Sequence, residues 1–165
     1  MTATAAAKKP KELEIGQKAP DFSMPTNKGD VVSLAALKGK TIVLYFYPKD
    51  DTPGCTQEAK DFRDSIAEFE KAGAVVIGVS KDSLKSHENF QKKYCLPFPL
   101  ASDEGGQVCE NYGVWVQKSM YGKTYMGIER STFVIDKAGK LADIVRKVKV
   151  EGHVAAMLDA VKALA

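Results

Sequence analysis

Cysteine is scarce in this sequence, and the few cysteines are not spaced for a structural role. There are three among 165 residues, Cys55, Cys95 and Cys109. An odd number at wide intervals does not provide the disulfide framework of a small secreted domain. Together with the two histidines, the cysteines show no closely paired ligands of the zinc type. The scarcity predicts free thiols in a reducing compartment and no structural metal.

Long apolar runs and an excess of one charge sign are also missing. No segment approaches the roughly 20 apolar residues that span a bilayer, and the alanine run near the start is too short and polar for a signal peptide. The net charge is +3, of which three lysines and one glutamate in the first twelve residues supply +2. We therefore expect a soluble, cytoplasmic protein without a membrane or nucleic-acid surface.

The length and composition suit one folded unit with a proper core. The chain is 44% hydrophobic and has a common single-domain length. Residues 1–12 are mainly small residues and lysines, which bury too little surface to offset the entropy of ordering. We expect a flexible tail over 1–12 and a single domain over 13–165.

Two apolar runs of strand length, "TIVLYFY" at 41–47 and "AVVIGVS" at 74–80, lie on either side of a helical pattern. Continuous β-branched runs are typical of strands covered on both faces. Between them, apolar residues recur at steps of 4, 3, 4 and 3, on one stripe of a helix: Cys55, Ala59, Phe62, Ile66 and Phe69. Strand, helix and strand over about 40 residues predict a right-handed βαβ unit with parallel strands.

The rest of the chain adds further elements around this unit. We expect a helix over 82–94, a short strand near 97–102, a brief helix ending at Gly113, a polar loop over 117–127, an antiparallel hairpin over 131–145 and a C-terminal helix. Ahead of the unit, a first hairpin turns at "NKGD". The predicted fold class is α/β, with a central mixed sheet flanked by helices and an N-terminal hairpin.

Cys55 stands at the predicted start of the first long helix. Pro53 and Gly54 break the chain before it, so the thiol falls in the first turn, where free amides and the helix dipole favour an anion. Complete ionisation of a thiol of pKa about 8.5 raises the thiolate fraction roughly thirtyfold at pH 7, but lower basicity removes roughly tenfold in nucleophilicity. A fast nucleophile therefore needs donors that stabilise the leaving group. The candidates are the Thr52 hydroxyl and the amides of Gly54 and Cys55, with Pro48 shielding the site.

The spacing of Pro48, Thr52 and Cys55 matches the P-x3-T-x2-C motif of the peroxiredoxins. The segments "YFYPKDDTPGCT", "FPLASDEGGQVCENYGVW" and "MYGKTYMGIERSTFVID" resemble the branch called bacterioferritin comigratory protein or PrxQ, and the resemblance covers nearly the whole chain after the tail. It implies a thioredoxin-like fold in which Cys55 is the peroxidatic cysteine. Thr52 and Arg130 would align the peroxide, and Pro48 would screen the thiolate.

The resemblance also implies a reaction. The thiolate reduces hydrogen peroxide or an organic hydroperoxide, leaves a sulfenic acid and is recycled by thioredoxin or a glutaredoxin system. No metal, haem or flavin is implied, and we expect a monomer. The main rival is a thiol–disulfide oxidoreductase, but that chemistry needs a second cysteine three positions after Cys55, where this chain has Glu58. The other rival is a binding module that has lost the chemistry.

The resolving cysteine departs from the family pattern. One PrxQ subclass places it five residues after the peroxidatic cysteine, where this chain has Lys60, and another places it in the next helix, at the position of Gln91. Cys95, one helical turn further on, is the remaining candidate, and it requires local unwinding to meet Cys55. A mechanism with one cysteine and an external thiol stays open. Cys109 is expected to be a small buried hydrophobe.

Three other features have ordinary interpretations. His87 and His153 are expected at surface or capping positions. Residues 49–51 are expected to form a solvated loop edge. The aromatic residues 45–47 belong to a core pattern, although one of them is a candidate wall for the peroxide pocket.

Overall fold

The structure is a computed structural model that describes residues 12–165. Its elements follow the predicted alternation of strands and helices. In chain order they are β1 (Ser23–Pro25), β2 (Val31–Ser33), the 3-10 helix η2 (Ala35–Leu37), β3 (Thr41–Phe46), α1 (Pro53–Lys71), β4 (Ala74–Ser80), α2 (Leu84–Tyr94), β5 (Leu100–Ser102), α3 (Gln107–Asn111), β6 (Trp115–Met120), β7 (Lys123–Ile128), β8 (Ser131–Ile135), β9 (Leu141–Arg146) and α4 (His153–Leu164). All but the last residue of the tail predicted over 1–12 lies outside the described residues.

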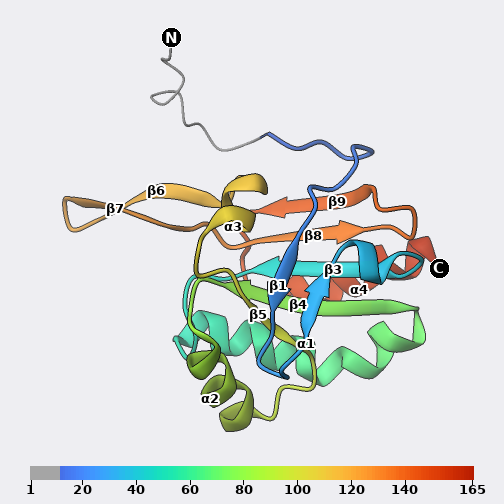
Figure 1. Cartoon of the computed structure of the whole chain (residues 1–165), viewed down its shortest axis with the longest axis horizontal. Coiled ribbons are helices and arrows are strands. Elements are labelled where there is room, and N and C mark those ends of the chain that lie inside the picture. Colours follow the sequence, from blue (N-terminus) through green and yellow to red (C-terminus); the bar gives the residue numbers. More distant parts are fainter. Residues whose placement is uncertain (1–11) are drawn as a thin grey trace.

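Five strands form the central sheet, in the order β5-β4-β3-β8-β9. β3 is parallel to β4 and antiparallel to β8, in registers that place Thr41 opposite Ala74 and Phe46 opposite Ser131. β1 and β2 pair separately as the N-terminal hairpin. The predicted βαβ unit, the mixed sheet and the hairpins at both ends of the chain are therefore confirmed (Figure 1).

The strand that leads to Cys55 is buried along its whole length. Its side chains alternate between two cores, because successive residues of a strand point to opposite faces of the sheet. Ile42, Leu44 and Phe46 join a core with the N-terminal hairpin and α3, and Val43, Tyr45 and the following Tyr47 join a core with α1, α2 and α4. The continuous apolar run thus serves both faces, as predicted for a central strand.

The segment 117–127, predicted as a loop, is part of a regular hairpin instead. β6 and β7 pair antiparallel along their full lengths. The turn residues Tyr121 and Gly122 have φ values of 52° and 77°, as a type I′ hairpin turn requires. The sequence pattern missed the hairpin because most of the ribbon is exposed, so apolar and polar residues do not alternate. In Figure 1 the hairpin extends away from the sheet.

Both histidines are buried, which corrects the expectation of surface or capping positions. His87 is 0% and His153 is 6% exposed. His153 is the first residue of α4, and its Nε2 lies 2.8 Å from the Thr132 hydroxyl. Burial lowers the pKa of His153 to about 4, with a further contribution from the charge of Arg130. Buried polar rings are stable where hydrogen bonds satisfy them, and a linear pattern does not reveal such partners.

Candidate active site

Cys55 occupies the third position of α1, as the break at Pro53 and Gly54 predicts. Thr52 precedes the helix in an extended conformation, with φ −99° and ψ 156°. Its carbonyl accepts the first helical hydrogen bond from the Thr56 N–H at 2.8 Å. Cys55 itself is 1% exposed. The thiol therefore lies in a buried first turn, beside backbone N–H groups that have no partner within the helix.

Arg130 lies directly before β8 and contacts this thiol. Its Nη2 donates to Cys55 Sγ at 3.4 Å, and its Nη1 donates to Glu58 Oε1 at 2.7 Å. The two residues are far apart in sequence, but β8 pairs antiparallel with β3 and places Ser131 opposite Phe46. Arg130 therefore arrives beside the end of the strand whose continuation carries Cys55. A guanidinium at this distance stabilises negative charge on sulfur and on oxygen bound next to it.

Gly54 is required by the close approach of the guanidinium. A Cβ at this position would lie 3.1 Å from Arg130 Nη2 and 3.8 Å from its Cζ. Because that contact is shorter than an ordinary van der Waals distance, a larger residue would push Arg130 away from the sulfur. Glycine thus leaves room for the cation, in addition to supplying a free N–H in the first turn.

Glu58 is a site residue that the sequence interpretation missed. It is 0% exposed and holds Arg130 by a buried ion pair. Burial raises its pKa to about 7, and the charge of Arg130 opposes this shift. Its second oxygen, Oε2, is buried without a hydrogen bond, as is the hydroxyl of Tyr45. Glu58 lies three residues after Cys55 on the buried stripe of α1. The available signal was a carboxylate on the buried stripe, because a buried carboxylate needs a cation beside it.

Thr52 and Pro48 lie on the loop before α1. The Thr52 hydroxyl donates to the Lys49 carbonyl at 2.8 Å. This bond uses the hydroxyl proton and leaves its oxygen lone pairs free to accept. Pro48 is half-buried at the end of β3. The structure thus brings Arg130 and Gly54 directly to Cys55, while the Thr52 hydroxyl is bound to its own loop.

Asp50 corrects the expectation of a solvated loop edge, because it is only 7% exposed. Its carboxylate accepts hydrogen bonds from the hydroxyls of Tyr47 and Ser86 at 2.6 and 2.7 Å, and His87 Nδ1 lies 2.7 Å from it. Asp50, Asp82 and His87 have potential metal-ligating atoms within 4.8 Å of one another. Hydrogen bonds already engage these atoms, so the cluster holds the loop before α1 against the start of α2.

The other two cysteines have contrasting environments. Cys95 is exposed and follows the last residue of α2, with a left-handed φ of 53°, so the helix ends where the sequence predicts. Cys109 is buried, as expected. Burial raises the pKa of Cys109 far above its usual range, and the nearby Asp103 carboxylate adds to this effect. Cys55 and Cys95 are both free thiols, one inside the molecule and one at its surface.

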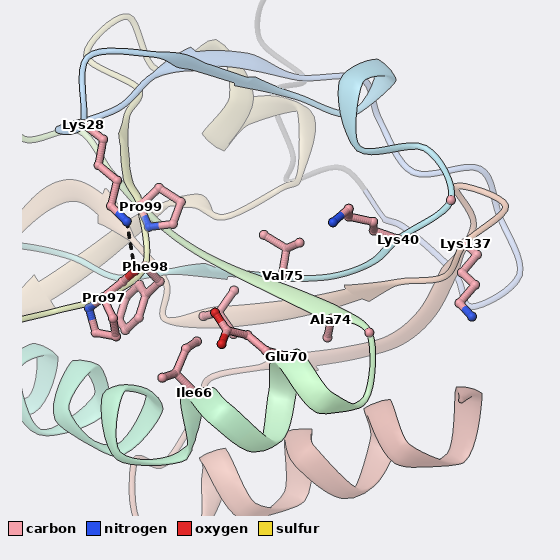
Figure 2. A pocket seen from close by; sticks show the side chains of 13 residues that line it. Lys28, Lys40, Ile66, Glu70, Ala74, Val75, Pro97, Phe98, Pro99 and Lys137 are labelled. Carbon is pink, nitrogen blue, oxygen red and sulfur yellow. Dashed lines mark hydrogen bonds between the residues drawn. The ribbon is translucent and has the colours of Figure 1, made fainter.

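A groove of about 490 Å³ lies elsewhere, by the start of β4 rather than the end of β3 (Figure 2). It lies between α1 and the segment before β5, and three lysines surround it; the residues labelled in the figure are Lys28, Lys40, Ile66, Glu70, Ala74, Val75, Pro97, Phe98, Pro99 and Lys137. Lys28 Nζ donates to the Pro97 carbonyl across one end. Cys55 does not line this groove, so it is not the candidate active site.

Comparison with known proteins agrees with this geometry. The model of the AhpC/TSA family matches residues 15–144. A putative peroxiredoxin bcp of Coxiella burnetii is 58% identical over 143 residues, covering 87% of this chain and 95% of the relative. Peroxiredoxin Bcp of Bacillus subtilis is 55% identical over 91% of this chain and 96% of its own length.

Solved structures give the same result. A structure of peroxiredoxin Q from Xanthomonas campestris has a TM-score of 0.85 at 46% identity, covering 90% of this chain and 97% of the other. A PrxQ variant from Xylella fastidiosa has a TM-score of 0.88 at 36% identity, covering 93% and 98%.

The chain therefore belongs to the AhpC/TSA family and, within it, to the peroxiredoxins of the Bcp/PrxQ type. The predicted resemblance and the thioredoxin-like fold class are both confirmed. As a peroxiredoxin the protein is an enzyme, a thiol peroxidase.

Proposed function

We propose that this peroxidase reduces hydrogen peroxide and organic hydroperoxides with Cys55 as the peroxidatic cysteine. One observation carries the proposal: the Arg130 guanidinium donates to the Cys55 sulfur at 3.4 Å in the first turn of α1. A related structure supports the organic substrates, because it comes from work on the alkyl peroxide reduction activity of the Xanthomonas campestris bacterioferritin comigratory protein.

The reaction is a two-electron transfer from sulfur. The Cys55 thiolate attacks one peroxide oxygen and forms an S–O bond while the O–O bond breaks. The leaving oxygen takes the bonding electrons and the proton of the attacked oxygen, and departs as water or an alcohol. Cys55 is left as a sulfenate, which takes a proton from solvent to become a sulfenic acid. Negative charge moves from sulfur to the leaving oxygen, and donors aimed at that oxygen lower the barrier.

Five residues supply the surroundings for this step. Arg130 holds both the thiolate and the peroxide oxygen, and Glu58 fixes Arg130 through the ion pair at 2.7 Å. The Gly54 N–H lies in the first turn and adds a donor without a side chain. The Thr52 hydroxyl oxygen accepts a hydrogen bond from the peroxide O–H with its free lone pairs, and Pro48 screens the thiolate from water.

Cys95 is our candidate for the resolving cysteine. Cys55 is buried and Cys95 is exposed, and a disulfide needs Cα atoms within about 7 Å, so the helix ends must open locally before the sulfurs meet. Thioredoxin or a glutaredoxin would then reduce the disulfide. A mechanism with one cysteine, in which an external thiol reduces the sulfenic acid, is the alternative.

The cellular setting completes the proposal. We place the enzyme in the cytoplasm, as a monomer with a single domain over 13–165. Among residues 12–165, no helix combines the length and the apolar character of a membrane span.

Peroxide consumption with a thiol reductant tests the central assignment. Cys55→Ser removes the nucleophile and is expected to abolish turnover, whereas full activity of this variant would refute the assignment. A non-reducing peptide map after one equivalent of peroxide tests the second cysteine. It is expected to contain a Cys55–Cys95 disulfide, and Cys55 found only as sulfenic or sulfinic acid would favour the one-cysteine alternative.

A further inference from the structure

The last turn of α2 is tied to the active-site loop through a single carboxylate. Lys93 Nζ donates to Asp51 Oδ2 at 2.8 Å, and the Tyr94 hydroxyl donates to Asp51 Oδ1 at 2.9 Å. Cys95 follows directly after these two residues. Asp51, Lys93 and Tyr94 are called the Asp51 clamp below. The clamp joins the loop that precedes Cys55 to the helix end that carries Cys95.

The two ends of α2 are attached with unequal strength. At the start, Ser86 and His87 contact the buried carboxylate of Asp50. At the end, the ion pair of the Asp51 clamp is exposed, 42% for the Asp51 side chain and 57% for that of Lys93, while Tyr94 is half-buried. Exposed ion pairs contribute little free energy, whereas a buried hydrogen-bonded network is costly to break. The end of the helix therefore opens more readily than its start.

Buried residues on either side confine this opening to a few residues. Phe90 is 2% exposed on α2, and Leu96 is 0% exposed just after it. Residues 91–95 lie between these two anchors. Among them, Tyr94 is half-buried against the core that α1, α2 and α4 share, with its ring 5.6 Å from the ring of Phe90, so opening must also withdraw Tyr94 from this core. Besides the clamp, two hydrogen bonds hold these residues: Arg63 Nη1 donates to the Tyr94 carbonyl and Gln91 Nε2 donates to the Leu96 carbonyl, both at 2.9 Å.

The backbone at the end of α2 favours release of the clamp. Asp51 has a φ of 58° and Cys95 a φ of 53°. Residues other than glycine rarely adopt the left-handed region, because Cβ comes close to the backbone there. Cys95 has this conformation at the end of α2, and opening of the helix end relieves it, whereas aspartate adopts this region more readily than most residues.

We propose that Asp51 is a positioning residue for the resolving step: its clamp holds Cys95 on the helix end, and release of the clamp lets Cys95 reach oxidised Cys55. The inference rests on the proposed role of Cys95. In this step the Cys95 thiol loses its proton, and its sulfur attacks Sγ of the Cys55 sulfenic acid. The S–S bond forms as the S–O bond breaks, and the departing hydroxide takes the proton to give water.

Three variants release the clamp: Asp51→Asn, Lys93→Met and Tyr94→Phe. The clamp contacts exist only in the closed state and stabilise it. Removing them lowers the barrier to opening and so speeds disulfide formation. After one equivalent of hydrogen peroxide, we expect the Cys55–Cys95 disulfide to form about 1.5-fold to fivefold faster in each variant, the range that follows from surface contacts of this kind. At excess peroxide, less Cys55 sulfinic acid is expected. Rapid quench and mass spectrometry measure both quantities.

The charges of these variants separate the clamp from a simple electrostatic effect. Asp51→Asn removes a negative charge, Lys93→Met removes a positive one and Tyr94→Phe changes none. Release of the clamp predicts acceleration in all three, whereas an effect of charge on the thiols predicts opposite changes in the first two. Glu88→Gln is the matched control, because it breaks ion pairs with lysines of the same helix without touching the loop, and it should leave the rate unchanged.

The outcomes distinguish this inference from the proposed function. If the native protein forms a Cys55–Cys95 disulfide and the three variants form it at the native rate or more slowly, the clamp proposal is overturned and the role of Cys95 stands. If the native protein consumes peroxide but forms no such disulfide, the role of Cys95 and the clamp proposal both fail, while Cys55 remains the peroxidatic cysteine.

Discussion

Cys55 and Cys109 occupy the same local position in two different helices. Each is the third residue of its helix, α1 for Cys55 and α3 for Cys109, and they are 1% and 0% exposed. Their neighbours differ in charge. The Cys55 sulfur accepts a hydrogen bond from the Arg130 guanidinium at 3.4 Å, whereas the Cys109 backbone N–H donates to the Asp103 carboxylate at 2.8 Å.

The comparison shows that a helix start alone does not make a cysteine reactive. Burial raises the pKa of Cys109, and the Asp103 carboxylate adds to this effect. At Cys55 the Arg130 guanidinium donates to the sulfur instead. This cation, and not the helix start that both cysteines share, distinguishes the surroundings of Cys55 from those of Cys109.

Removing the cation should make Cys55 resemble Cys109. Arg130→Met is expected to lower kcat/KM for hydrogen peroxide by about 10²-fold to 10³-fold, the usual loss when one aligned donor is removed. Competition kinetics measure this ratio. A matched double variant, Arg130→Met with Glu58→Gln, avoids leaving a buried carboxylate unpaired and should show the same loss. A reduction below fivefold in both would contradict the role of Arg130.

The Glu58 carboxyl group, which pairs with Arg130, should make the free energy of unfolding depend on pH. The pKa of Glu58 is raised from 4.5 to about 7 by burial, so the folded state binds this proton more tightly than the unfolded state. Its contribution to the free energy of unfolding is full below pH 4.5 and is lost as the pH rises towards 7. The loss is about 3 kcal/mol.

His153 acts with the opposite sign over nearly the same range. Its pKa is lowered from 6.5 to about 4, so its contribution is lost as the pH falls from 6.5 towards 4. The contributions of Glu58 and His153 to the pH dependence of the free energy of unfolding therefore cancel in the native protein. Urea unfolding at several pH values should show stability rising with pH in Glu58→Gln and falling with pH in His153→Gln. Parallel curves for the two variants would contradict the assignment.

A smaller change tests the space around the cation. Gly54→Ala places a Cβ 3.1 Å from Arg130 Nη2 and is expected to slow Cys55 oxidation by about tenfold, because a displaced donor is lost in part. Gly105→Ala is the control, since a Cβ there meets nothing within 4 Å. Stopped-flow fluorescence with hydrogen peroxide measures both rates, and equal rates would show that Arg130 has room to move.

The smallest effect is expected at the inert cysteine itself. Cys109→Ala should leave the peroxide rate within about twofold of the native value, because no charge near Cys55 changes, and should lower stability by about 1 kcal/mol, as a small core deletion does. Peroxidase assays and urea unfolding measure these two quantities. A large loss of peroxidase activity in a folded Cys109→Ala protein would remove the distinction between the two thiols.

Local patterns predicted the parts of the fold that they determine. The stripe from Cys55 to Phe69 gave α1, and the two apolar runs gave β3 and β4, because burial repeats at the period of the element. The hairpin of β6 and β7 was missed, since an exposed ribbon leaves no alternation. Its turn has Tyr121 in a left-handed conformation, which a tyrosine does not predict.

Local sequence patterns predicted less of the candidate active site than of the fold. Only the family resemblance placed Arg130 beside Cys55, because their contact depends on the register of β8 against β3. Asp50 and His87 look solvated in a linear sequence, yet each supplies the partner that makes the other's burial stable. Glu58 was overlooked although its place on the buried stripe was visible.

The antiparallel pairing of β3 with β8 has a consequence for folding. Side chains of a strand change face at every residue, so a slip of β8 by one position would turn Arg130 to the opposite face of the sheet, away from α1. A chain with that error still has its thiol but no cation beside it. Fast peroxide turnover thus reports that the strands have aligned correctly, and a refolding assay based on it would count only correctly paired sheets.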